Sequence, residues 1–131
     1  MRFEYKHFAF LGAESEQAAE AAECAREQGQ FWPYHDTLFA NQRGENQGAF
    51  REDALKAFAA ALGLDEAAFD QCLESGRYED EVRSETAAGQ QRGVRSTPTL
   101  FINGEKVEGA VPFAQLQPRI EAILAAARSG E

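Results

Sequence analysis

Two cysteines are the residues of this chain whose side chains could carry redox or nucleophilic chemistry. Cys24 and Cys72 are the only cysteines among 131 residues, and they do not form a Cys-x-x-Cys pair. Thiol–disulfide exchange begins when a thiolate attacks a disulfide sulfur, and a second thiol then resolves the mixed disulfide. The attacking cysteine is normally activated at the start of a helix. Both cysteines lie well inside predicted helices, so we expect neither to be a nucleophile.

The histidines do not add a second kind of chemistry. His7 and His35 lack metal-ligand spacing to each other or to the cysteines, and a structural zinc site needs about four clustered ligands. We therefore expect no metal site. A histidine can tune a neighbouring thiolate, but with no activated thiolate we interpret His7 as a structural or edge-strand residue.

A Thr-Pro pair stands immediately before an apolar segment in "STPTLFING", residues 96–104. Thr99 to Ile102 are β-branched or apolar and are followed by Asn-Gly, which predicts a strand that ends in a hairpin turn. Proline donates no N–H, so Pro98 belongs at the first residue of a strand, at an edge or at a bulge. From these residues alone, a trans proline that opens the strand is the simplest interpretation.

The elements that would position these residues follow from periodicity. Residues 2–8 alternate with a period of two, which predicts a strand. Apolar residues at helical spacing, with glycine stops, predict helices through the middle of the chain. We expect an α/β (or α+β) fold with a small sheet and about six helices. The expected ranges are strand 2–8, helices 14–28, 31–42, 51–63, 66–75, 78–92 and 112–127, and hairpin strands 98–102 and 106–110.

Composition limits the classes of function. A length of 131 residues suits one domain, and 44% hydrophobic residues argue against disorder. The net charge of -9, with scattered basic residues, argues against a nucleic-acid partner. No apolar run reaches the roughly 18 residues of a membrane span, and the charged, alternating start does not have the pattern of an export signal.

Four motifs, in this order, resemble the DsbA-like branch of the thioredoxin superfamily, in which a helical domain is inserted into a thioredoxin fold. They are "RFEYKHFAFLG", "SEQAAEAAECAREQGQFWPYHDTLFANQ", "FDQCLESGRY" and "GVRSTPTLFINGEKVEGAVP", which together span residues 2–112. The resemblance implies an incomplete thioredoxin-like fold over 1–131. Residues 14–92 would be the helical insert, and residues 2–8 and 93–128 the remaining thioredoxin-like portion.

The resemblance also implies roles for four residues. Pro98 would be the family's cis-proline, and Thr97 the residue whose backbone pairs with an extended substrate peptide. Cys24 and Cys72 match motifs that carry a structural disulfide in some DsbA-like proteins. Two free, buried cysteines remain the alternative, favoured in a reducing cytoplasm.

The chain departs from the family at its catalytic centre. The family places a strand, a Cys-x-x-Cys and a long helix ahead of the strand matched by residues 2–8, and this sequence holds no Cys-x-x-Cys. We expect a DsbA-like thiol:disulfide oxidoreductase fragment, truncated at the N-terminus, that is inactive in redox chemistry. The alternatives are a non-catalytic peptide-binding or homo-oligomeric assembly module, and a truncated reading frame. The coding DNA upstream of Met1 would separate them.

The resemblance limits the expected partners. An extended peptide or a protein thiol would be the substrate, and no cofactor is implied because the family's chemistry uses cysteine alone. The missing catalytic strand would lie between the strands matched by 2–8 and 99–102, leaving unpaired edges. Strand 2–8 could close directly onto the hairpin, but we expect pairing across a two-fold axis and hence a homodimer. The family is mostly extracytoplasmic, which leaves the compartment of this chain undetermined.

Overall fold

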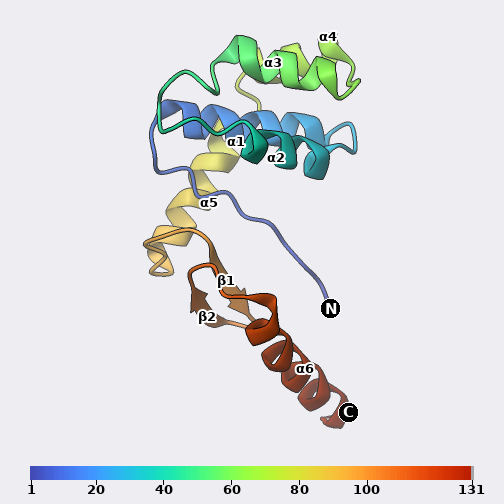
Figure 1. The fold of residues 1–131 in the computed structure, drawn as a ribbon, viewed down its shortest axis with the longest axis vertical. Coiled ribbons are helices and arrows are strands. Elements are labelled where there is room, and N and C mark those ends of the chain that lie inside the picture. The colour runs from blue at the N-terminus through green and yellow to red at the C-terminus, as the bar shows by residue number, and fades with distance from the viewer. Residues whose placement is uncertain (131) are drawn as a thin grey trace. The chain divides into compact units, whose positions relative to one another are not determined.

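The fold was analysed in a computed structural model that describes residues 1–130 (Figure 1). The chain divides into two compact units. One unit comprises residues 6–88, and the other comprises residues 1–5 together with the chain from Gly89 onward.

The unit formed by residues 6–88, called here the helical unit, is organised around its first helix. That helix contacts the next three (Figure 1). Its residues Ala21, Ala22 and Ala25 are buried, and their small side chains let the neighbouring helices approach closely. The helices are α1 (Ala13–Arg26), α2 (Phe31–Ala40), α3 (Glu52–Ala61), α4 (Glu66–Glu74) and α5 (Glu79–Gln91), of which α5 extends into the second unit.

Larger side chains from the other helices fill the core of this unit. Tyr34, Leu55 and Phe69 are completely buried, and the rings of Tyr34 and Phe69 lie 5.5 Å apart. The Tyr34 hydroxyl donates a hydrogen bond of 2.9 Å to the carbonyl of Leu55, which joins α2 to α3. Burial raises the pKa of Tyr34, so the hydroxyl keeps its proton and remains a donor.

A disulfide bond joins Cys24 on α1 to Cys72 on α4. Each cysteine is 1% exposed. The bond links residues separated by 48 positions, and residues 1–130 contain no free cysteine. The crosslink therefore fastens the first helix of the unit to the fourth.

The second unit contains a hairpin and the last helix. Strands β1 (Thr99–Ile102) and β2 (Glu105–Glu108) pair in antiparallel register, with Ile102 opposite Glu105. The two turn residues, Asn103 and Gly104, have φ values of 47° and 91°. Positive φ at both positions is what a type I′ hairpin turn requires, and it explains the Asn-Gly pair. Helix α6 (Phe113–Ser129) follows.

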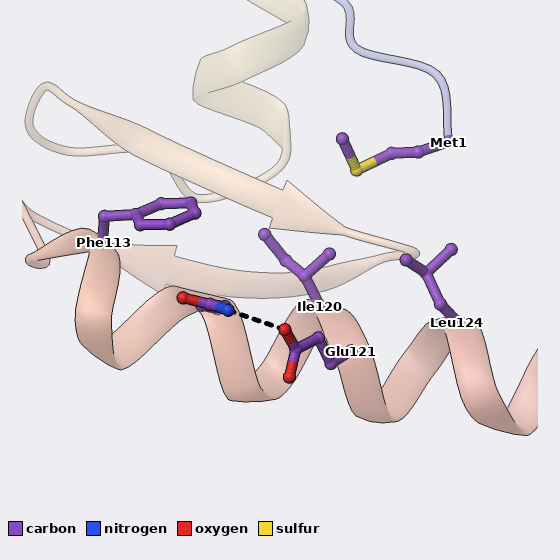
Figure 2. Close-up of a pocket in the computed structure, with 6 residues that line it drawn as sticks. Met1, Phe113, Ile120, Glu121 and Leu124 are labelled. Atoms are coloured by element: carbon purple, nitrogen blue, oxygen red, sulfur yellow. Dashed lines mark hydrogen bonds between the residues drawn. The ribbon is translucent and has the colours of Figure 1, made fainter.

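Helix α6 presents apolar side chains to a groove of about 260 Å³ (Figure 2). Phe113, Ile120 and Leu124 line the groove together with Met1. On the same helix, the Gln117 amide donates a hydrogen bond of 2.7 Å to Glu121, drawn as a dashed line in Figure 2. None of the residues that the sequence singled out for chemistry lines this groove.

The prediction of six helices and a small sheet is confirmed for the described residues, but the strand predicted over residues 2–8 is wrong. A period of two in the sequence indicates a segment whose side chains differ on its two sides. A β-strand also needs a neighbouring strand with which its backbone can hydrogen-bond. The sheet of the described chain contains only β1 and β2. Within the helical unit, the N–H of His7 instead donates to the Glu85 carboxylate at 2.6 Å, and that of Ala9 to the Thr86 hydroxyl at 3.0 Å.

We predict that Tyr34→Phe lowers the free energy of unfolding by about 1–2 kcal/mol, because the Leu55 carbonyl is left buried without its donor. Urea unfolding with an unchanged m value measures this loss. Tyr78→Phe is the matched control: its hydroxyl bonds Glu27 at the surface, where water can replace it, so a smaller loss is expected. An equal loss in both variants would contradict the prediction.

We also predict that the double substitution Cys24→Ala, Cys72→Ala lowers the free energy of unfolding by about 4 kcal/mol. The chain-entropy model assigns this value to a crosslink that closes a loop of this length. The wild-type chain unfolded with and without reductant provides the comparison at constant sequence. Identical unfolding curves under the two conditions would show that the bond does not form.

Candidate functional site

The four residues singled out by the sequence form two pairs. Thr97 and Pro98 precede β1 in the unit that contains the hairpin, whereas Cys24 and Cys72 lie in the helical unit. The two pairs therefore belong to different units.

The Thr97–Pro98 loop is held at both ends and exposed between them. The peptide bond between these residues is cis. The Pro98 carbonyl accepts a hydrogen bond of 2.9 Å from the Gly109 N–H, which extends the hairpin pairing one residue beyond β1. The Thr99 hydroxyl donates to the Ser96 carbonyl at 2.7 Å. Residues 95–98 are all exposed, so a defined stretch of backbone is presented to solvent.

The strand that follows has one open edge. Because Pro98 bonds to Gly109 in the register that places Leu100 opposite Val107, the backbone groups of Leu100 face β2. Residues of a strand alternate in this respect, so the backbone groups of Thr99 and Phe101 face the opposite edge. In the sheet of the described residues no strand lies along that edge. Such a row of N–H and C=O groups can pair with an added extended chain.

Two basic side chains contact the hairpin, and sequence reasoning missed them because it treated the basic residues as scattered. The Arg92 guanidinium lies 3.7 Å from the centroid of the Phe101 ring, a cation–π contact. The Lys106 ammonium lies 3.2 Å from the Gly93 carbonyl and 2.8 Å from Glu108. The hydrogen bond from Lys106 to Glu108 lowers the pKa of Glu108, and the positive charge of Arg95 lowers the same pKa to a smaller extent.

The cysteines offer no attacking group. Both sulfurs are joined in the buried disulfide, so no thiolate is available within residues 1–130. The described chain also contains no cluster of three His, Cys, Asp or Glu side chains placed to bind a metal ion. None of the helices in the described residues has the length and apolarity that a membrane crossing demands.

The sequence also did not predict the buried polar pair that His7 forms with Glu23. His7 and Glu23 are each 6% exposed, with 2.7 Å between Nε2 and Oε1. Arg26 donates from Nε to the other carboxylate oxygen, Oε2. Burial raises the pKa of Glu23, but the hydrogen bonds from His7 and Arg26 outweigh it, so the pKa lies below its usual value. His7 is thus a buried partner of α1 and not a residue of an edge strand.

We predict that Glu23→Gln makes stability less dependent on pH under acidic conditions. A carboxyl whose folded pKa is lowered stabilises the fold above its unfolded pKa, near 4.5, and the contribution is lost as pH falls through the folded pKa. Between pH 6 and pH 3 the wild type should lose more free energy of unfolding than the variant, measured by urea unfolding. Glu66→Gln, at an exposed position on α4, should follow the wild type. Parallel curves for Glu23→Gln and wild type would refute the assignment.

Known proteins resemble this chain over most of its length. It is 34% identical over 113 residues to a protein named Na(+)/H(+) antiporter NhaA from Herminiimonas arsenicoxydans, a match that covers 86% of this chain and 17% of that protein. It is 26% identical over 102 residues to a probable disulfide bond formation protein D from Bacillus anthracis, covering 75% and 47% of the two chains. The chain therefore spans less than a fifth of the antiporter and about half of the second relative.

A solved structure and a family profile agree on the fold. The crystal structure of a thioredoxin-like oxidoreductase from Silicibacter pomeroyi DSS-3 superposes with a TM-score of 0.75 at 26% identity, covering 92% of this chain and 67% of that one. The profile described as Thioredoxin matches residues 1–122. The helical unit, the Thr-Pro loop and the hairpin are thus parts of a known architecture, and the chain belongs to the thioredoxin family.

Proposed function

We propose that this chain is a DsbA-like member of its family whose Thr97–Pro98 loop binds an extended peptide, and that the 131 residues do not catalyse thiol–disulfide exchange. The observation that carries the proposal is the state of the cysteines: both are buried and bonded to each other. Exchange needs an accessible thiolate, and the sequence holds no Cys-x-x-Cys.

Three observations support the peptide-binding part of the proposal. Residues 95–98 are exposed, the Pro98 carbonyl accepts a hydrogen bond from the Gly109 N–H, and the Thr99 hydroxyl donates to the Ser96 carbonyl, so the exposed loop has a defined backbone. Main-chain pairing of this kind gives affinity without demanding a particular sequence. The names of two similar proteins, a disulfide bond formation protein and a thioredoxin-like oxidoreductase, favour a protein substrate. The match to the antiporters covers too little of them to suggest ion transport.

We predict that the chain does not accelerate reduction of insulin by dithiothreitol above the rate without protein. The physical reason is that reductant must open the buried Cys24–Cys72 bond before any thiol exists. Turbidity reports insulin reduction, and a thioredoxin at equal concentration provides the positive control. Alkylation of the natively purified chain followed by mass spectrometry should find no modified cysteine. Insulin reduction at a rate near that of the control would overturn the proposal.

The open edge of β1 also favours a second candidate, an assembly module in which β1 of one copy pairs with β1 of another. Two antiparallel copies of one strand satisfy a two-fold axis, the commonest symmetry of soluble oligomers. Exposed apolar residues of the same unit, Phe3 and Phe113, would gain cover from a second copy. This candidate does not need a peptide substrate.

The assembly module predicts a homodimer in solution at micromolar concentration, because each copy would cover the other's open strand edge. Light scattering coupled to size exclusion measures the molar mass, which should be twice the 14.4 kDa of one chain. A monomer across the micromolar range would contradict the assembly module and leave the edge free for a peptide.

A further inference from the structure

We propose that the contacts of Glu27 and Gln28 with the two ends of α4 control access to the Cys24–Cys72 disulfide. A thiol reductant reaches either sulfur only when α4 moves off α1, and these polar contacts set how often that movement occurs. The inference assigns two positioning residues, which lie next to each other immediately after α1. It concerns the helical unit alone and does not depend on the proposed peptide site.

Gln28 joins the end of α1 to the start of α4. Its side-chain oxygen accepts a hydrogen bond of 2.8 Å from the Asp65 N–H, and its side-chain nitrogen donates one of 3.1 Å to the Asp65 carbonyl. Asp65 is the N-cap of α4, and its carboxylate accepts from the Ala68 N–H at 2.9 Å. One side chain thus binds both backbone groups of the residue from which α4 begins.

Glu27 joins the same end of α1 to the turn that follows α4. The Nη1 atom of Arg77 lies 2.8 and 2.7 Å from the two Glu27 oxygens, and the Tyr78 hydroxyl donates to Oε1 at 2.6 Å. The hydrogen bonds from Tyr78 and Arg77 lower the pKa of Glu27, so the carboxylate stays ionised at neutral pH. The Arg77 N–H also donates to the Cys72 carbonyl at 3.4 Å, which connects this contact to the cysteine.

The disulfide lies between these two contacts and is closed to solvent. Cys72 is inside α4, and each cysteine is only 1% exposed. Thiol–disulfide exchange requires a thiolate to approach a sulfur directly, so reduction needs a local opening that separates α4 from α1. Because the contacts of Glu27 and Gln28 must break for this separation, loss of either one raises the population of the open form.

The chemical step uses a dithiol reductant. One reductant thiolate attacks a sulfur of the open form, the S–S bond breaks, and the other cysteine leaves as a thiolate that takes up a proton. The second reductant thiol then attacks the mixed disulfide, which releases the second cysteine and closes the reductant into its oxidised ring. When α4 recloses faster than the thiolate attacks, the measured rate is proportional to the population of the open form.

Reduction of the oxidised 131-residue chain by dithiothreitol tests the inference. Alkylation followed by mass spectrometry measures the rate, at reductant concentrations where the rate rises in proportion to the reductant. Gln28→Ala should be reduced about five- to thirtyfold faster than the wild type, because two hydrogen bonds are lost. Arg77→Gln should be reduced about two- to fivefold faster, the size expected for an exposed ion pair.

Two further variants distinguish local opening from unfolding of the whole unit. Tyr34→Phe loses the hydrogen bond between α2 and α3 and so lowers global stability, but it leaves the contacts between α1 and α4 in place. Its reduction rate should equal that of the wild type. Arg83→Gln is the matched charge control: it removes ion pairs with Glu16 on α1 and Glu79 on α5, and should also leave the rate unchanged. Urea unfolding gives the global stability of every variant.

The other outcomes overturn the inference. Reduction of Tyr34→Phe as fast as that of Gln28→Ala would show that reductant enters through unfolding of the whole unit. Wild-type rates for both Gln28→Ala and Arg77→Gln would show that Glu27 and Gln28 do not control access. A wild type that is reduced as fast as a short peptide disulfide would show that its sulfurs are already accessible.

Discussion

The face of α1 that carries Ala21, Ala22 and Ala25 brings neighbouring helices close to its backbone, and the helical unit depends on this approach. The Cα atoms of Cys24 and Cys72 lie 5.8 Å apart, a separation that a disulfide accepts. A larger side chain in this stripe would push α4 away and prevent the bond. The same packing seals both sulfurs from solvent. The closeness that permits the crosslink therefore also removes the chain's two sulfurs from redox chemistry.

The second unit is ordered although few of its side chains are buried. No residue of α6 is fully buried, and of the two strands only β2 contributes a buried side chain, Val107. Its order comes from local features: a two-residue turn with positive φ at both positions, the Pro98–Gly109 bond and the Thr99–Ser96 bond. These fix the backbone of the loop and the strand while leaving one edge and one face accessible.

Much of this could be predicted from residue patterns, and the failures have a common cause. Helical spacing and glycine stops placed the six helices, and Asn-Gly placed the turn, because these signals are local. Residues 2–8 were mistaken for a strand because alternation cannot show whether a neighbouring strand exists. The Glu23 contact with His7 and the Arg92 contact with Phe101 join residues distant in sequence or element, and no local pattern encodes them. Periodicity assigned no role to Thr97 and Pro98, and their expected roles came from the resemblance to the family.

The manner in which α5 holds residues 7 and 9 has a consequence for how this protein can vary. Two side chains, Glu85 and Thr86, provide the acceptors for backbone donors that a strand would give to a neighbouring strand. A backbone ladder persists through most substitutions, since every residue except proline supplies the same groups. Side-chain acceptors depend on two particular residues, so a change at either one would loosen the segment while the helix stayed intact. Attachment of this segment through its backbone therefore depends on two side chains of α5 and not on a backbone ladder.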